Sequence, residues 1–172
     1  TKSLSESYII SSECKFLIFR ISWTYSKYGK NFVKTVVKKL KNGEKLRVID
    51  DQYGCPTNLD YVCLIVYKFL LLIKKKKYQT KDIWHISHKG VTNWYLFAKE
   101  IQNYFSYSKD PNKIYSIKSK DYKSLAKRPK YSKLSSNKLD NFLGITVKDN
   151  HWKIQLNKFM KNNFNNKNLL RK

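Results

Sequence analysis

Two strand-like segments of this chain each end in residues that could contact a ligand, because open α/β sheets bind ligands at strand ends. Trp23 follows one apolar run and could stack its aromatic face on a sugar or a base. Gln52 lies in the polar turn 51–57, directly after a second run. Arg128 adds a guanidinium fork that matches phosphate oxygens. These residue types indicate a binding site, although a core tryptophan, a structural turn and a salt bridge would also use them.

The histidines and cysteines show none of the spacings that metal sites require. No carboxylate or cysteine accompanies the histidines in a ligand pattern, so we predict no metal site. The cysteines form no Cys-x-x-Cys pair and are odd in number, which favours small buried side chains in a reducing compartment, and hence a cytoplasmic protein. The residues concerned are His85, His88 and His151, and Cys14, Cys55 and Cys63.

The net charge of +24 is extreme, with 36 Lys plus Arg against 12 Asp plus Glu. Such a charge attracts polyanions, and nucleic-acid binding is one interpretation. Base recognition relies on arginine, however, and Arg20, Arg47, Arg128 and Arg171 are the only arginines here. Lys, Asn, Tyr and Ile are abundant together, which is typical of drift towards AT-rich codons. We therefore favour drift and predict no specific nucleic-acid partner.

Apolar runs and helical periodicities alternate along the chain, which predicts an α/β fold. Short apolar runs predict strands at residues 15–21, 45–49 and 82–87, and a weaker alternation predicts an edge strand at 113–118. Helical spacing predicts helices at residues 3–12, 31–41, 135–142 and 151–164. Two further helices are expected after caps at Thr57 or Asn58 and at Thr92.

The longest apolar run, residues 62–73, is too short to span a bilayer and is interrupted by Lys68. A basic cluster at residues 74–77 follows it, so an amphipathic membrane anchor is one interpretation. A core helix with a solvated basic end fits the same pattern better. We predict no membrane association.

The stretch from Phe19 to Thr57 carries a family resemblance. Residues 20–25 read R-I-S-W-T-Y, residues 29–32 read G-K-N-F, and residues 48–57 read V-I-D-D-Q-Y-G-C-P-T. This order resembles the dTDP-4-dehydrorhamnose reductases, which belong to the extended short-chain dehydrogenase/reductase group. In that family R-T-S-W-(V/L)-Y, G-x-N-F and V-x-D-Q-x-G-x-P-T follow one another. Ile21 and Thr24 depart from the pattern.

The resemblance extends to the first residues of the chain. The family motif Y-G-x-T-K-x-x-x-E precedes R-T-S-W, and Thr1, Lys2 and Glu6 match its T-K and E at the expected distance from Trp23. The resemblance implies that Lys2 is the catalytic lysine, which lowers the pKa of a tyrosine and holds the nicotinamide ribose. The tyrosine itself would precede Thr1 and is absent from the chain. Since the single Met is Met160, we expect a processed chain or a fragment.

The resemblance also implies a set of substrate contacts. Trp23 corresponds to the sugar-nucleotide contact of R-T-S-W. Asn31 and Phe32 match N-F at a helix start, where they could meet phosphate or sugar. Gln52 is the expected polar contact of the turn, and Arg128, in a segment that resembles R-P-x-x-S-x-L, is the expected cation for the nucleotide diphosphate. Helix capping, packing and structural ion pairing remain alternative roles for these residues.

Further matches place almost the whole chain within the resemblance. Residues 83–87 and 91–94 resemble (I/L)-Y-H-L-S and T-S-W. The similarity corresponds to the C-terminal part of an extended short-chain reductase, with the last Rossmann strands and the substrate-binding lobe, and with the N-terminal Rossmann half missing. We expect the end of the cofactor-binding domain with a catalytic-helix remnant at 1–29, mainly the sugar-nucleotide lobe at 30–164 and a basic tail at 165–172.

The resemblance implies a function for the intact family: reduction of a dTDP-4-keto-6-deoxy-L-sugar to dTDP-L-rhamnose, a polysaccharide precursor, with NADPH or NADH. A dinucleotide site normally opens with a glycine-rich turn, and this chain has five glycines and no such turn. We therefore expect a chain that is inactive alone, with a dTDP-sugar as its partner and a homodimer as one possible assembly. The open alternatives are another nucleotide-sugar epimerase or reductase, a non-catalytic regulatory relative, and a basic nucleic-acid-binding protein.

Overall fold

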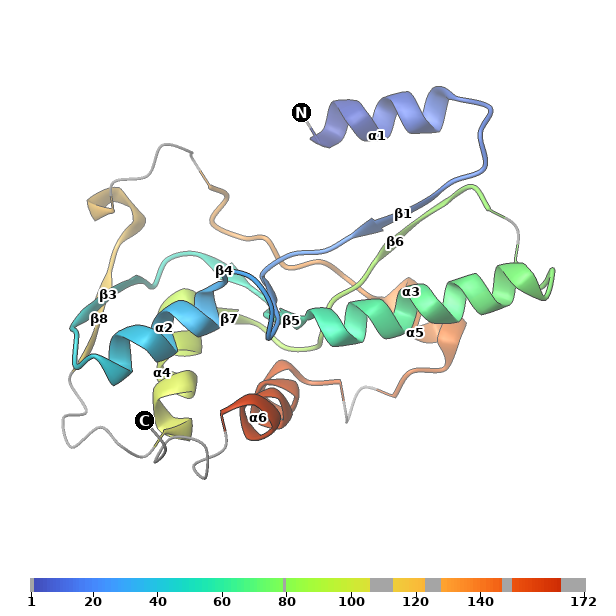
Figure 1. Cartoon of the computed structure of the whole chain (residues 1–172). Coiled ribbons are helices and arrows are strands. Elements are labelled where there is room, and N and C mark those ends of the chain that lie inside the picture. The colour runs from blue at the N-terminus through green and yellow to red at the C-terminus, as the bar shows by residue number, and fades with distance from the viewer. Residues whose placement is uncertain (1, 79, 106–112, 123–127, 147–149, 165–172) are drawn as a thin grey trace.

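The computed structural model describes residues 2–78, 80–105, 113–122, 128–146 and 150–164 (Figure 1). Within these ranges, short strands pair two by two and helices cover them. Three of the pairs are parallel and one is antiparallel. The pairs are β1 (Leu17–Arg20) with β6 (Asp82–His85), β2 (Thr24–Tyr25) with β5 (Thr57–Asn58), β3 (Leu46–Ile49) with β8 (Ile114–Ile117), and β4 (Tyr53–Gly54) with β7 (Thr92–Asn93).

One hydrophobic cluster lies around the β1–β6 pair. Apolar side chains of α3 (Leu59–Lys74) and α5 (Asn137–Leu143) pack there against strand residues, with Phe69 fully buried at the centre. Figure 1 shows α3 running alongside the two strands, with α5 next to it. The buried members are Val62, Ile65, Phe69, Trp84, Ile86 and Leu139.

A second, larger cluster lies around the β3–β8 pair. Helix α4 (Trp94–Tyr104) contacts both strands and also packs against α2 (Phe32–Lys41) and α6 (Trp152–Asn163). The two clusters draw on segments from both sides of the boundary expected at residue 30, and that domain division stays a prediction. A short 3-10 helix, Ser119–Asp121, follows β8.

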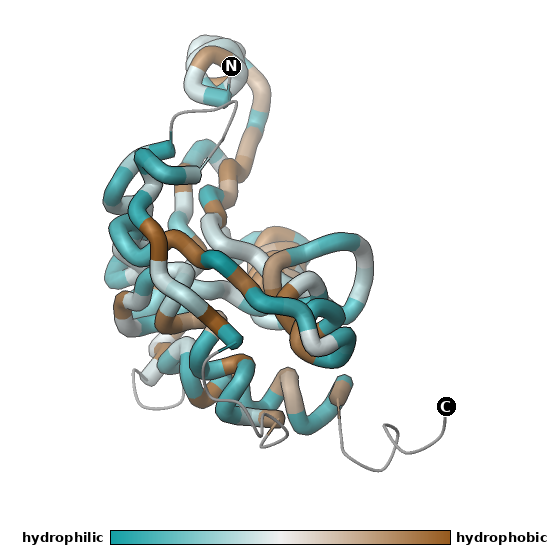
Figure 2. The backbone as a smooth tube through the Cα atoms, turned by 90° about the vertical axis from the view of Figure 1, so that its left-hand side faces the viewer, coloured by the Kyte–Doolittle hydropathy of each residue, from teal (hydrophilic) through white to brown (hydrophobic). Residues whose placement is uncertain are grey.

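Helix α1 (Lys2–Ser11) stands away from both clusters in Figures 1 and 2 and buries none of its residues. One side-chain contact links it to the strand that follows. The Arg20 guanidinium donates from Nε to both carboxylate oxygens of Glu6, at 3.1 Å each, and from Nη2 to Oε2. Glu6 and Arg20 belong to two motifs of the family resemblance, and the structure brings them together.

The helices and the longer strands lie close to their expected positions, and the α/β class is confirmed. One expected cap is wrong: Asn93, not Thr92, caps α4, because Asn93 Oδ1 accepts the Leu96 N–H at 2.7 Å. The expectation of buried cysteines holds for Cys55 alone, since Cys14 follows α1 and Cys63 lies on the outer face of α3, both exposed. The tail from residue 165 lies outside the described residues.

Helix α3 contains the apolar run that raised the question of a membrane anchor. Its inner face is buried, and its outer face exposes Leu64, Tyr67 and Leu70. Among the described residues, no helix is both long enough and apolar enough to cross a bilayer.

Candidate functional site

Trp23 occupies the connection between β1 and β2 in a left-handed backbone conformation, with φ of 49°. This conformation costs a non-glycine residue about 1–2 kcal/mol. The Thr57 N–H donates to the Trp23 carbonyl oxygen at 3.1 Å and fixes the backbone against the turn that precedes β5. The strained backbone conformation therefore lies at Trp23, which the sequence predicts to be a ligand contact.

Three neighbours hold the Trp23 indole. Its ring stacks on Trp94, with centroids 3.6 Å apart and planes 9° apart. Gly54 lies directly against the ring, and the indole N–H donates to Ser132 Oγ at 2.9 Å. Stacking of two aromatic rings contributes about 0.5–1.5 kcal/mol beyond burial, which offsets much of the backbone cost. A ligand would meet the part of the ring that Trp94 leaves uncovered.

Ser132 joins Trp23 to the turn containing Gln52. Its N–H and its hydroxyl both donate to the Tyr53 carbonyl oxygen, at 2.8 and 3.2 Å, and the Tyr53 N–H donates to the Lys130 carbonyl oxygen at 2.7 Å. The structure thus gathers the R-I-S-W segment, the turn 51–57 and the segment 128–134 in one place, although they are far apart in the chain.

Asn31 and Phe32 lie beside this assembly with roles in helix structure and packing. Asn31 caps α2: its Oδ1 accepts the Lys34 N–H at 3.2 Å, and its Nδ2 donates to the Ser26 carbonyl oxygen at 2.8 Å. Phe32 packs against Trp94, with ring centroids 4.7 Å apart. Asn31 therefore fixes the start of α2, and Phe32 packs against the Trp94 ring of the stack.

Gln52 is a predicted contact whose side-chain amide can still form hydrogen bonds. Only 8% of its surface is exposed, and its side-chain amide forms no hydrogen bond within the described part of the chain. The amide nitrogen and oxygen are not among the buried side-chain atoms without a partner, so the small exposed part of the residue includes its polar end. Gln52 can therefore donate to and accept from a ligand next to Tyr53.

The two predicted cations lie at the surface. Arg128 is exposed in the segment that reaches Ser132, with no ion pair to any described residue. Lys2 is exposed in the first turn of α1 and likewise forms no ion pair in the described ranges. The structure does not bring Lys2 into contact with Trp23, Gln52 or Arg128.

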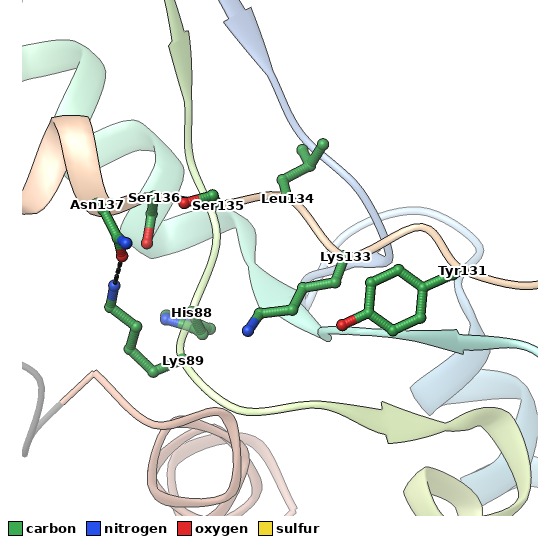
Figure 3. Close-up of a pocket in the computed structure, with 8 residues that line it drawn as sticks. All are labelled: His88, Lys89, Tyr131, Lys133, Leu134, Ser135, Ser136 and Asn137. Carbon is green, nitrogen blue, oxygen red and sulfur yellow. Dashed lines mark hydrogen bonds between the residues drawn. The ribbon is translucent and has the colours of Figure 1, made fainter.

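A cavity of about 340 Å³ opens beside the Trp23 assembly (Figure 3). Its walls come from two segments, the connection between β6 and β7 and the loop that enters α5. Among the residues that the structure describes, no Asp or Glu lines it. The lining residues are His88, Lys89, Tyr131, Lys133, Leu134, Ser135, Ser136 and Asn137.

The floor of this cavity is neutral. His88 is 1% exposed, and its Nε2 accepts the Asn58 N–H at 3.2 Å. The ring proton must therefore lie on Nδ1, which contacts Asn150 Oδ1 at 2.6 Å. Burial lowers the pKa of His88 to about 4. Burial likewise raises the pKa of the Cys55 thiol to about 11, and the thiol donates to the His88 carbonyl oxygen at 3.1 Å.

The two lysines of the cavity differ in their surroundings. The Lys89 ammonium forms an ion pair with Asp140 Oδ2 and donates to Asn137 Oδ1 at 3.0 Å. The Ser136 hydroxyl also donates to Asp140, at 2.9 Å. Lys133 has no carboxylate partner in the described ranges, so its charge is uncompensated.

Sequence reasoning missed Trp94, Ser132 and the cavity lysines as members of one site. Trp94 and Ser132 fall in the later family matches, and that was their one detectable signal. Lys89 and Lys133 are two lysines among many, so composition hid them. Among the described residues, no group of three or more potential metal ligands occurs.

Comparison with known proteins identifies the family. The family model described as the RmlD substrate binding domain matches residues 1–164. The chain belongs to the RmlD substrate binding domain family. Among curated relatives of this RmlD-family chain, the dTDP-4-dehydrorhamnose reductase of Sinorhizobium fredii is 31% identical over 149 residues, which cover 86% of this chain and 50% of the relative.

Solved structures support the same assignment for the RmlD-family chain. The dTDP-4-dehydrorhamnose reductase of Bacillus anthracis, in complex with NADP, superposes with a TM-score of 0.77 at 28% identity, covering 94% of this chain and 53% of that one. A dTDP-4-dehydrorhamnose reductase from Clostridium acetobutylicum gives a TM-score of 0.76 at 31% identity, with 93% and 53% covered. The chain spans about half the length of the relatives it matches, consistent with the predicted C-terminal portion of an extended short-chain reductase.

Proposed function

We propose that this chain is the sugar-nucleotide-binding part of an NAD(P)H-dependent dTDP-4-dehydrorhamnose reductase, acting in the cytoplasm on a dTDP-4-keto-6-deoxy-L-sugar. The observation that carries the proposal is the hydrogen bond between Trp23 Nε1 and Ser132 Oγ. It joins the R-I-S-W segment to the R-P-K-Y-S-K-L segment, and Ser132 is bonded in turn to Tyr53 of the turn 51–57. Three matches to one enzyme family thus converge on one surface.

The proposal gives each residue of the assembly a role. The uncovered part of the Trp23 ring contacts the sugar nucleotide, and the Gln52 amide supplies hydrogen bonds to it. Arg128 supplies a fork for phosphate oxygens, because a guanidinium pairs with them in bidentate geometry. Asn31 and Phe32 hold the start of α2 and the Trp94 ring in place, so that the Trp23 ring is positioned before a ligand arrives.

The described residues do not by themselves fit a whole dinucleotide. None of the chain's glycines forms a glycine-rich turn between a strand and a helix, which is where a pyrophosphate would be held. Lys2 is the one residue proposed to touch the cofactor, at the nicotinamide ribose, where it would also lower a tyrosine pKa. We derive no reaction step from this chain alone, and we expect the 172 residues alone to be inactive.

The proposal is tested by binding and turnover with the full chain. Isothermal titration with dTDP, at an ionic strength of about 0.15 M to screen the surface charge, should show saturable one-site binding. Trp23→Ala should weaken that binding about tenfold, as expected for the loss of one stacking contact with the ligand. Trp84→Ala, in the other hydrophobic cluster, is the matched control.

Three outcomes would contradict the proposal or a part of it. Equal binding of dTDP by the wild type and Trp23→Ala would show that Trp23 is not part of the binding site. Salt-dependent binding of duplex DNA that is tighter than binding of dTDP would favour a polyanion-binding role. NADPH oxidation by the chain alone with the keto-sugar nucleotide would disprove the expected inactivity. Sedimentation equilibrium would test whether the chain forms a homodimer, which is one possible assembly.

A further inference from the structure

The cavity next to the Trp23 assembly contains a positive charge that no described residue of its walls balances. As far as the structure describes the chain, its lining includes two ammonium groups and no carboxylate. The Asp140 carboxylate neutralises Lys89 from behind, whereas Lys133 has no anionic partner among the described residues. His88 cannot add charge of either sign near neutral pH, because both ring nitrogens already have partners and burial lowers its pKa to about 4.

The cavity adjoins the proposed substrate site along one segment of the chain. Ser132 contacts the Trp23 indole, and its two neighbours in sequence, Tyr131 and Lys133, both line the cavity. Tyr131 also pairs with Tyr53 across the turn 51–57. The cavity therefore begins at the residues on either side of the Ser132 contact with Trp23.

The groups that face the cavity are hydrogen-bond donors suited to an anion. Figure 3 shows the Lys133 ammonium and the Tyr131 hydroxyl pointing into the same space in front of His88. A lysine ammonium is a compact charge that binds phosphate oxygens, and a neighbouring hydroxyl can donate to the same group. Tyr131 is 60% exposed and Lys133 is also exposed, so salt screens their attraction for an anion, and binding should weaken as ionic strength rises.

We propose that Lys133 and Tyr131 bind a phosphoryl group of the nucleotide sugar in this cavity. This inference rests on the proposed function and deepens it, because it assigns the phosphate contact to Lys133 rather than to Arg128 alone. Arg128 lies outside the cavity lining, in the exposed approach to Ser132. Lys89 is a positioning residue, since its ion pair with Asp140 holds the β6–β7 connection against α5.

Titration calorimetry on the full chain tests this assignment with three probes: dTDP, inorganic pyrophosphate and thymidine. Lys133→Gln should weaken binding of dTDP and of pyrophosphate about tenfold and leave thymidine affinity unchanged, as expected for the loss of one charge-assisted contact. Tyr131→Phe should weaken the two anions about threefold. Lys130→Gln is the matched control, because it removes the same charge from the same loop at an exposed position outside the cavity.

The outcomes separate the cavity from the proposed function. Wild-type binding of dTDP that Lys133→Gln does not weaken would overturn the phosphoryl assignment and leave the proposed function standing. Pyrophosphate binding that depends on Lys133, without any binding of dTDP, would support the anion cavity and overturn the proposed substrate. Equal losses in Lys133→Gln and Lys130→Gln would show that the general surface charge is responsible, and would overturn the assignment.

Discussion

Gly54 and Trp23 are in direct contact: a Cβ on residue 54 would lie 2.4 Å from Cε2 of the indole. The backbone of Gly54 lies outside the left-handed region, so its lack of a side chain serves the close approach and not the conformation. The turn 51–57 and the β1–β2 connection are fitted to each other at this point. The same contact positions Trp23 for its stack on Trp94.

The Gly54–Trp23 contact predicts the effect of a single methyl group. Gly54→Ala should displace the indole, lower the free energy of unfolding by about 1–3 kcal/mol and reduce the circular-dichroism couplet of the Trp23–Trp94 pair. Gly29→Ala is the control, because Gly29 has a φ of 63° and open space around it. It should lose about 1 kcal/mol from backbone strain and keep the couplet. An unchanged couplet in Gly54→Ala would contradict the contact.

His88 should give the protein a measurable acid sensitivity. Its pKa is lowered to about 4 by burial, against about 6.5 in the unfolded chain. Above pH 6.5 both states are neutral there, and between about pH 6.5 and 4 the unfolded state binds the proton first. Stability is therefore lost as the pH falls through this window, by about 3 kcal/mol in total.

Urea unfolding from pH 8 to pH 4 measures this loss. His88→Gln should be less stable than the wild type at pH 8, because it breaks the contacts with Asn58 and Asn150, but its stability should fall less steeply below pH 6.5. His85→Gln, at the end of β6, is the matched variant. Parallel curves of stability against pH for the wild type and His88→Gln would show that His88 does not cause the acid sensitivity.

The ion pair of Lys89 and Asp140 should be costly to break from one side. Asp140 is 6% exposed and its Oδ1 has no partner, so Lys89→Met would leave a buried, uncompensated carboxylate. We expect a loss of about 3–5 kcal/mol in the free energy of unfolding, and partial recovery in the double variant with Asp140→Leu. Lys39→Met, which removes an exposed pair with Glu44, should cost about 1 kcal/mol or less. Equal losses of stability in Lys89→Met and Lys39→Met would contradict this prediction.

The contact between Glu6 and Arg20 should control the order of α1. The Arg20 hydrogen bond lowers the pKa of Glu6, so this tether is present at neutral pH and is lost as the pH falls through the Glu6 range. Arg20→Gln should speed amide hydrogen exchange in α1 and leave the melting temperature nearly unchanged, because α1 buries none of its residues. Glu13→Gln is the control. Slow exchange in α1 of Arg20→Gln would show that another contact holds the helix.

Sequence reasoning predicted the longer elements because apolar spacing marks them directly. It could not predict β2, β4, β5 and β7, since a two-residue strand has no periodicity to detect. These short strands matter for the site, because β4 and β7 bring Tyr53 next to Asn93, directly before Trp94. The sequence predicted Thr92 as the cap of α4, but the side-chain oxygen of Asn93 accepts the Leu96 N–H instead.

Single residues of the site were predictable, but their relationships were not. Trp23 and Gln52 stand out by type and by position after a strand. The partner of Trp23 in its stack is the first residue of α4, and Ser132 lies 109 residues away in sequence. Local sequence composition gives no indication of either contact. The uncompensated charge of Lys133 depends on where Asp140 points, which only tertiary packing decides.

The parallel registers described for the two longer strand pairs also bear on how fast the chain folds. Leu17 pairs with Asp82 and Leu46 with Ile114, so each pair forms only after a long intervening segment has been closed. Closing such segments costs chain entropy before any strand contact repays it, and proteins rich in such contacts refold slowly. We infer that α2, α3 and α4 form their local turns early, and that refolding of this chain is limited by the assembly of its strands.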